Sequence, residues 1–213
     1  MKKYNIFDAP VIGDRIKRYI ISSEGGDKTS LTLRRYVLDK YKVEVGIHTY
    51  GGCFNKEFNV GGTVKIGRYC SFAQDIRYFG ANHPIHSAIL SPYFYNSKWG
   101  GYSVKDVERN QLTVGNDVWV GYGTIITSSC HFIGNGSIIG AGSIVTKDVK
   151  PYSIVVGSPA KLLKMRFDED VCSALEESNW YNLEPDEIMQ YYSFLNDPLE
   201  FARQIIMSKG SRE

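Results

Sequence analysis

The stretch "VGNDVWVGYGTIITSSCHFIGNGSIIGAGSIV", residues 114–145, repeats one short pattern with a period of six. Aliphatic residues six apart come in two runs, one residue out of frame with each other: Val114, Val120 and Ile126, then Ile133, Ile139 and Val145. This period fits neither the 3.6 residues of a helical turn nor the alternation of a half-buried strand. It is typical of short parallel strands joined by tight turns, with one aliphatic side chain per face pointing inward. Three such faces make one coil, and stacked coils bury a continuous aliphatic column, so the pattern predicts a parallel β-helix.

The same signal extends outward on both sides of this stretch. An aliphatic residue followed by glycine also occurs at Val45-Gly46, Ile66-Gly67 and Val156-Gly157. The frame shift falls within "TSSCHF", residues 127–132, where we expect one extra residue to form a bulge at a corner. A β-sandwich with glycine-rich turns is the alternative, but sandwiches usually show turn signals every 8 to 12 residues.

The repeats and the segment "GAGSIVTKDVKPYSIVVGSPAKLLKMRF", residues 140–167, resemble the hexapeptide-repeat acyltransferases. The fold of that family is a left-handed parallel β-helix, an exception to the right-handed crossover rule. "IGRYCSFAQDIRYFGANH" (66–83) and "LTVGNDVWVG" (112–121) are similar to the xenobiotic acetyltransferase branch. That branch includes chloramphenicol and streptogramin acetyltransferases and related sugar O-acetyltransferases. The resemblance implies an acetyl-CoA-dependent O-acetyltransferase.

The chain divides into three predicted parts: an N-terminal helical cap (1–42), a β-helix (43–165) and a C-terminal helical tail (166–213). An excursion loop at 84–111 interrupts the β-helix. In the cap, a short amphipathic helix is expected to turn one apolar face to the first coil: Leu31, Leu33, Val37, Leu38 and Tyr41. Asp168 is a candidate N-cap for the tail. An apolar stripe in the tail predicts a core: Trp180, Tyr181, Leu183, Ile188 and Tyr191.

His83 is the predicted catalytic residue. It ends the motif "GANH", where the resemblance puts the general base. The chemistry requires such a group, because a thioester is already activated and only the acceptor hydroxyl needs help to lose its proton. A neutral imidazole near pH 7 can take that proton. His86 is the competing candidate and is expected to have a structural or acceptor-contacting role, while His48 and His131 are expected to be structural.

The resemblance places acetyl-CoA along the later coils, with no metal. The expected donor-binding residues are these: Trp119, Gly121, Tyr122, Ala141, Thr146, Lys147, Lys161 and Lys164. The two last lysines would face the phosphates as point charges. A packing role for Trp119 and a solvated surface role for Lys161 and Lys164 remain alternatives. Backbone amides near the turns are expected to stabilise the oxyanion of the thioester.

The acceptor is predicted to be a sugar or glycan-precursor hydroxyl, with an antibiotic of the chloramphenicol or streptogramin type as the alternative. The excursion loop carries five aromatic residues, whose faces stack on sugar rings, line drug pockets or anchor loops: Tyr93, Phe94, Tyr95, Trp99 and Tyr102. Tyr50 matches a position that contacts the acceptor in streptogramin-acetylating relatives.

Composition excludes several other classes. Lys+Arg 25 against Asp+Glu 23 gives a net charge of +2, which is too small to indicate a nucleic-acid-binding protein. No apolar run approaches the ~20 residues of a membrane span. The four cysteines lack C-x-x-C or zinc spacing, which indicates reduced thiols and a cytoplasmic protein.

Two hypotheses from another class stay open at this point. A hexapeptide β-helix can be a non-catalytic scaffold or a metalloprotein similar to γ-class carbonic anhydrases. A zinc site of that kind needs three converging histidines, and the four in this chain are poorly placed for it. The resemblance also implies a homotrimer with the active site between neighbouring subunits.

Overall fold

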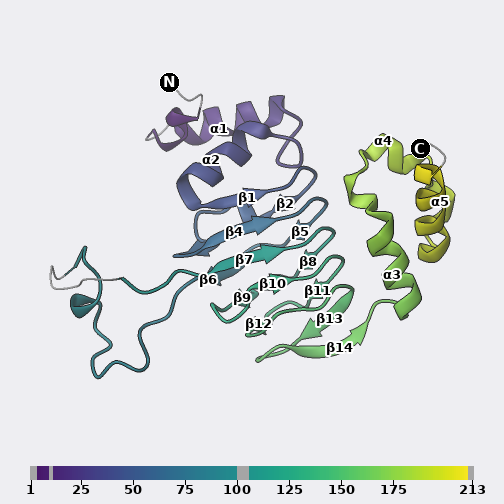
Figure 1. Cartoon of the computed structure of the whole chain (residues 1–213). Coiled ribbons are helices and arrows are strands. Elements are labelled where there is room, and N and C mark those ends of the chain that lie inside the picture. Colours follow the sequence, from purple (N-terminus) through teal and green to yellow (C-terminus); the bar gives the residue numbers. More distant parts are fainter. Residues whose placement is uncertain (1–3, 10–11, 100–105, 211–213) are drawn as a thin grey trace.

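The computed structural model describes residues 4–9, 12–99 and 106–210, and its main body is a prism with three parallel β-sheets as faces (Figure 1). Sheet A consists of β1 (Val43–Val45), β4 (Thr63–Ile66), β7 (Gln111–Val114) and β10 (Phe132–Ile133). Sheet B consists of β2 (Tyr50–Gly51), β5 (Ser71–Phe72), β8 (Trp119–Val120), β11 (Ile138–Ile139), β13 (Ser153–Val156) and β14 (Lys161–Met165). Sheet C consists of β3 (Asn59–Val60), β6 (Arg77–Phe79), β9 (Ile125–Ile126) and β12 (Ile144–Val145). The chain visits A, B and C in turn, so the predicted parallel β-helix is confirmed; only β14 runs antiparallel to its neighbour.

The period of six in the sequence is the spacing between successive faces. Val114, Val120 and Ile126 point into the prism from sheets A, B and C, and each is at most 2% exposed. Ile133, Ile139 and Val145 repeat this order one coil later and are equally buried. The extra residue lies in the turn 127–131, where Cys130 N–H donates to Thr127 O at 3.1 Å, so the predicted corner position of the frame shift is also confirmed.

Three edges join the faces, and each is named here by its turns. The A/B edge consists of residues 46–49, 67–70, 115–118, 134–137 and 150–152. The B/C edge consists of residues 52–58, 73–76, 121–124 and 140–143. The C/A edge consists of residues 61–62, 80–110, 127–131 and 146–148. Because a triangular prism has one face opposite each edge, the C/A edge lies opposite sheet B.

Helices cover the N-terminal end of the prism. They are η1 (Asn5–Asp8), α1 (Gly13–Ser23) and α2 (Leu31–Tyr41), of which the sequence predicted only α2. Ser30 caps α2 by accepting a hydrogen bond from Leu33 N–H at 3.1 Å. Leu33 and Val37 are buried as predicted, but the prediction was wrong for Leu31 and Leu38. They are exposed because α2 instead buries the face that carries Thr32, Arg34 and Tyr36.

The C-terminal tail packs against the A/B edge. It contains α3 (Glu169–Ser178), α4 (Pro185–Met189) and α5 (Pro198–Gly210), with short 3₁₀ turns η4 (Trp180–Asn182) and η5 (Tyr192–Phe194) between them. Asp168 occupies the N-cap position of α3, although its side chain makes no capping hydrogen bond. The predicted apolar stripe is confirmed in part, since Trp180, Leu183, Ile188 and Tyr191 pack around buried Leu175, Phe201 and Ile205. The division at residues 42 and 165 stays a prediction.

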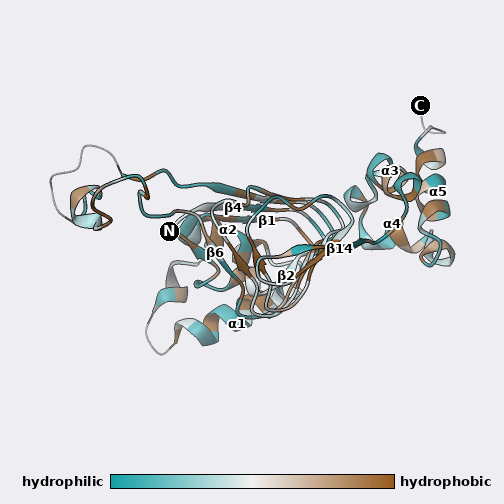
Figure 2. Cartoon of the chain, turned by 90° about the horizontal axis from the view of Figure 1, so that it is seen from below, coloured by the Kyte–Doolittle hydropathy of each residue, from teal (hydrophilic) through white to brown (hydrophobic). Residues whose placement is uncertain are grey.

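The excursion loop leaves the prism on the side opposite the tail, as the views in Figures 1 and 2 agree. Strand β6 ends at Phe79 and β7 begins at Gln111, so the loop starts four residues before the predicted Pro84. A 3₁₀ turn, η3 (Pro92–Phe94), is its only regular element among the described residues. Tyr102 lies outside the described residues.

Candidate active site

The neck of the excursion loop is fixed to the coil below it. Asn110 N–H donates to Gly80 O at 2.7 Å, which closes the loop where it leaves and rejoins the prism. Asn82 Nδ2 donates to Ser128 Oγ at 2.7 Å, and Asn110 Nδ2 donates to Ser128 O at 2.8 Å. Ser128 is buried in the next turn of the C/A edge, so one residue holds both ends of the neck. His83 follows Asn82 directly and therefore starts from a fixed backbone.

His83 is exposed at this edge, and a contact of its ring indicates which tautomer it adopts. Its Nδ1 lies 2.8 Å from Leu90 O. Because a carbonyl oxygen can only accept, we assign the hydrogen of the neutral ring to Nδ1. Nε2 then carries the lone pair, which is the arrangement that a general base requires. His86 also lies exposed in the loop, and no described contact links it to His83.

A cavity of about 410 Å³ lies at the C-terminal end of the prism, beside the C/A edge. Three predicted donor-binding residues line it together: Thr146, Lys147 and Lys161. Most of the remaining wall is aliphatic, from Val145, Val149, Val155, Ala160 and Leu162, while Lys150 adds a further positive charge and Asp148 one negative charge. An apolar hollow with several lysines around it suits a ligand with both apolar and anionic parts.

The cavity and His83 share one edge of the prism. Asn82 binds Ser128, and Thr127 of the same turn donates from Oγ1 to Val145 O at 3.2 Å, immediately before the cavity residue Thr146. Neighbouring strands are about 4.8 Å apart, so the base of the loop and the cavity turn 146–148 lie two coils, about 10 Å, apart along the axis.

The other predicted donor-binding residues lie elsewhere. Gly121 and Ala141 stack at the B/C edge, where a Cβ on Gly121 would come within 2.5 Å of Ala141 N, so only glycine fits there. Tyr122, on the same edge, donates from its hydroxyl to Asp75 Oδ2 at 2.5 Å, and this hydrogen bond raises the pKa of the tyrosine. Lys164 is exposed on β14. A single chain therefore does not gather these residues around the cavity.

Trp119 and Tyr50 share the outer face of sheet B. Tyr50 pairs with Ser71 and Ser71 with Trp119 in the parallel register, and both aromatic side chains are exposed. Lys28 Nζ lies 5.2 Å from the centre of the Tyr50 ring. Since sheet B is opposite the C/A edge, one chain keeps the predicted acceptor residue Tyr50 away from His83.

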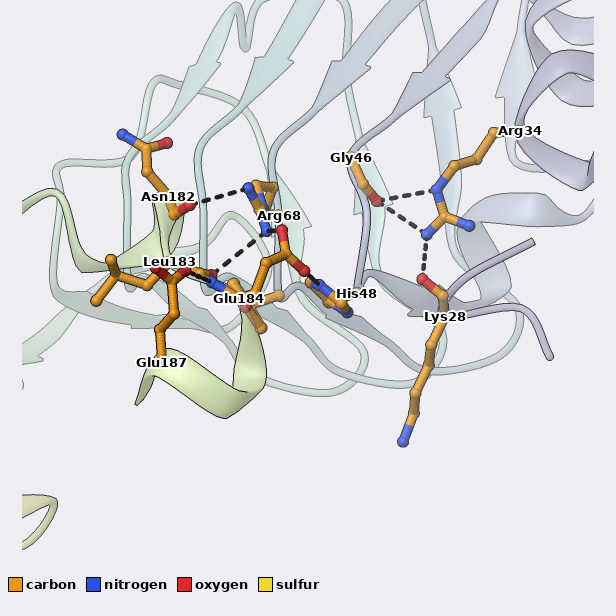
Figure 3. A network of polar contacts seen from close by, with 10 residues as sticks. Lys28, Arg34, Gly46, His48, Arg68, Asn182, Leu183, Glu184 and Glu187 are labelled. Atoms are coloured by element: carbon orange, nitrogen blue, oxygen red, sulfur yellow. Dashed lines mark hydrogen bonds and ion pairs between the residues drawn. The ribbon is translucent and has the colours of Figure 1, made fainter. Parts of the chain in front are cut away.

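Of the other two histidines, His48 makes structural contacts through its side chain. His48 Nε2 lies 2.8 Å from Glu184 Oε2 (Figure 3), and its ring stacks on the Tyr69 ring with centroids 4.8 Å apart. Arg68 also binds Glu184, at 2.5 Å. Hydrogen bonds from His48 and then Arg68 hold the pKa of Glu184 below its usual value. His131 contributes its backbone N–H to Asp148 Oδ1 at 2.6 Å.

Four residues around the candidate base were not predicted to act there: Asn82, Leu90, Ser128 and Tyr95, which the sequence had marked only as an aromatic residue of the loop. Asn82 lies within the "GANH" motif and could have been named from it. The other three carry no spacing signal, because a loop and a neighbouring coil bring them to His83. Among the described residues, no group of three or more His, Cys, Asp or Glu side chains is placed to hold a metal ion.

Comparison with known proteins identifies the family. Chloramphenicol acetyltransferase from Morganella morganii is 31% identical over 193 residues, which cover 86% of this chain and 88% of that protein. The chain belongs to the hexapeptide-repeat acetyltransferases. This acetyltransferase is also 31% identical over 159 residues to a probable macrolide acetyltransferase from Lysinibacillus sphaericus, covering 72% of the chain and 87% of the relative. No family model matches the sequence.

The predicted fold type agrees with this membership, and the prism is a left-handed parallel β-helix. The solved structure of a maltose O-acetyltransferase from Clostridium difficile 630 aligns with a TM-score of 0.46 at 26% identity, over 60% of this acetyltransferase and 61% of that chain. In the part of the chain that the structure describes, no helix is both long and apolar enough to cross a bilayer.

Proposed function

We propose that this acetyltransferase transfers the acetyl group of acetyl-CoA to a hydroxyl of a sugar or glycan precursor, with His83 as the general base. One observation carries the proposal: the hydrogen bond from Nδ1 to Leu90 O leaves Nε2 of an exposed histidine as a base, on the edge that bears the lysine-rimmed cavity. Neither a scaffold nor a metalloprotein needs this arrangement.

The reaction follows from that geometry. His83 Nε2 takes the proton of the acceptor hydroxyl while the acceptor oxygen forms a bond to the thioester carbonyl carbon. When the carbon–sulfur bond breaks, the sulfur leaves with the electron pair and receives the same proton from the imidazolium. His83 returns to its neutral form, and the products are an acetyl ester and the free thiol. General-base catalysis of this kind typically contributes about 10²- to 10⁴-fold.

The donor half of the proposal rests on the cavity. Its aliphatic wall suits the pantetheine arm, and Lys147 and Lys161 suit the phosphates, to which lysine binds as a point charge. Thr146 adds a hydroxyl at the end nearer to the turn 127–131. Lys164 follows three residues after Lys161 on the exposed strand β14 and can extend the positive charge outward.

We further propose that the complete site forms between copies of the chain, in a homotrimer. The candidate residues divide between the C/A edge and the opposite part of the prism, where Tyr50, Trp119, Gly121, Tyr122 and Ala141 lie. One ligand cannot touch both sides of one prism, but two prisms side by side can present these two surfaces to the same groove. The projecting excursion loop supports this arrangement, since Trp99 within it is 72% exposed.

An antibiotic hydroxyl is the second candidate acceptor. The names of the chloramphenicol and macrolide acetyltransferases, which match most of this chain, favour it. The exposed aromatic faces of Phe94 and Trp99 suit either acceptor. The unpaired cysteines support the further proposal that the protein works in the cytoplasm, where thiols stay reduced.

The test is a thiol-release assay with acetyl-CoA and a panel of sugar and antibiotic acceptors. We expect His83→Ala to lower kcat by at least about 10²-fold, while coenzyme A still binds and the melting temperature is unchanged. Light scattering on the same samples should give the mass of a trimer. Unchanged turnover in His83→Ala would reject the base, failure to bind acetyl-CoA at all would favour a scaffold, and an active monomer would reject the shared site.

A further inference from the structure

A second side chain reaches the same nitrogen of His83. Tyr95 Oη lies 2.8 Å from His83 Nδ1, and the two rings meet edge to face with centroids 6.0 Å apart and an interplanar angle of 87°. Tyr95 comes directly after η3, where its own N–H donates to Pro92 O at 3.2 Å. The side chain is half-buried, in contrast to its exposed neighbours Tyr93 and Phe94. The turn therefore directs this one aromatic residue of the loop back toward the histidine.

The position of the hydrogen on the His83 ring determines whether Tyr95 donates or accepts in this contact. Leu90 O, also 2.8 Å from Nδ1, has only lone pairs, so Nδ1 must carry a hydrogen. If Tyr95 donated to Nδ1 instead, that nitrogen would present a lone pair to the carbonyl at hydrogen-bond distance, which is repulsive. Tyr95 must therefore accept, and Nδ1–H is shared between the two oxygens. The proton of the tyrosine hydroxyl then points away from the imidazole.

We propose that Tyr95 is a positioning residue for His83. Its oxygen and the Leu90 carbonyl oxygen approach one N–H from two directions, so together they fix the ring with Nε2 toward the acceptor. Both oxygens also face the ring as it becomes positively charged, and hydrogen bonds to a charged group are stronger than those to a neutral one. Tyr95 thus stabilises the imidazolium that forms in the transition state. This inference rests on the proposed function of His83.

The first test is Tyr95→Phe, which removes the oxygen and keeps the ring. We expect kcat to fall about 10-fold, equivalent to about 1.4 kcal/mol. KM for acetyl-CoA and for the acceptor should stay within about twofold, and the melting temperature should not change. The matched control is Tyr192→Phe, an exposed tyrosine in the tail, which should keep full activity. A rise in KM at constant kcat would instead make Tyr95 a substrate-binding residue and overturn the proposal.

A double-mutant cycle separates action through His83 from an independent effect. In the His83→Ala background, Tyr95→Phe should cause no further loss, because the group through which Tyr95 acts is gone. The same 10-fold loss in both backgrounds would overturn the proposal. If His83→Ala is slow but Tyr95→Phe is fully active, the positioning role of Tyr95 is rejected and the role of His83 as the base is kept. If His83→Ala is fully active, the proposed base falls first and the role of Tyr95 with it.

Discussion

The A/B edge and the C/A edge are built from the same coils, yet they differ in how their polar groups are used. At the A/B edge the turns bind one another and the tail. Asn135 Oδ1 accepts from Asn116 N–H at 2.7 Å, Asn116 Oδ1 accepts from Arg68 N–H at 2.8 Å, and Asn135 Nδ2 donates to Glu176. At the C/A edge the chain instead opens into a loop that exposes His83. Under the proposed function, one edge supplies stability and the other holds the candidate base.

The backbone of the A/B edge is as regular as its hydrogen bonds. One residue in each turn has a left-handed conformation: His48, Tyr69, Asp117, Gly136 and Tyr152. This conformation strains any residue other than glycine, so the surrounding contacts must hold it in place. The C/A edge has no such repeated set among the described residues, and its turns vary in length from one coil to the next. That freedom is what allows a long loop to be inserted there.

The largest expected effect on stability is at Arg34, which lies on α2 and binds the first turn of the A/B edge. Its buried guanidinium donates to five carbonyl groups: those of Asp27, Lys28, Ser30, Gly46 and Thr49 (Lys28 and Gly46 are seen in Figure 3 with Arg34). Burial lowers the pKa of this arginine. We expect Arg34→Met to reduce the free energy of unfolding by at least about 3 kcal/mol, because each buried acceptor left unpaired costs about 1–3 kcal/mol.

Urea denaturation measures this loss, and Arg35→Met is the matched control. Arg35 is exposed on the same helix, so its replacement should change stability by less than about 0.5 kcal/mol. The folded fraction of Arg34→Met should turn over substrate at the wild-type rate. Equal stability of the two variants would remove the structural role that we assign to the A/B edge.

A pair of buried serines compares the two edges directly. Ser128→Ala at the C/A edge removes the acceptor of Asn82, and we expect kcat to fall about 5- to 10-fold because the segment before His83 is released. Ser137→Ala at the A/B edge removes a hydroxyl that lies 2.7 Å from Gly134 O and 2.9 Å from Lys150 O. It should cost about 1 kcal/mol of stability and leave kcat unchanged. Loss of activity in both variants, or in neither, would contradict the division between the edges.

The smallest expected effect concerns the exposed carboxylate of Glu184, which joins the tail to the A/B edge (Figure 3). Its pKa is lowered on folding from an ordinary value of 4.5, so its contribution to tail docking is complete above that pH and is lost as the pH falls through the lowered value. Trp180 fluorescence should report partial tail release in acid. In Glu184→Gln this acid step should be absent, whereas Glu177→Gln, at another exposed site, should retain it.

Much of the prism could be predicted from the sequence, and little of the site around His83 could be. The six aliphatic positions between Val114 and Val145 are all buried, because a period of six has one geometric solution for inward-facing side chains. The same reasoning failed for Leu31 and Leu38, since which face of a helix is buried depends on what packs against it. Nothing distinguishes Arg34 from Arg35 in the sequence, yet only Arg34 is buried.

The sequence predicted even less of how the residues of the candidate site are arranged. His83 came from a motif, but its partners Leu90 and Tyr95 lie seven and twelve residues further along a loop without periodicity. The predicted donor residues Thr146, Lys147 and Lys161 meet at one cavity, whereas Gly121, Tyr122 and Ala141 belong to another edge. Their order along the chain does not reveal this separation, because successive turns of a coil face different directions.

By itself the sequence determined that this chain stacks short parallel strands around an aliphatic column, because burial of apolar side chains depends on their spacing and hardly on their orientation. The tertiary structure alone decided which edge binds the tail, which edge opens, and which two oxygens face the imidazole. A hydrogen bond requires the donor and acceptor to lie within a few tenths of an ångström of their ideal separation and nearly in line. Between distant segments of the chain, this geometry exists only after the coils have stacked.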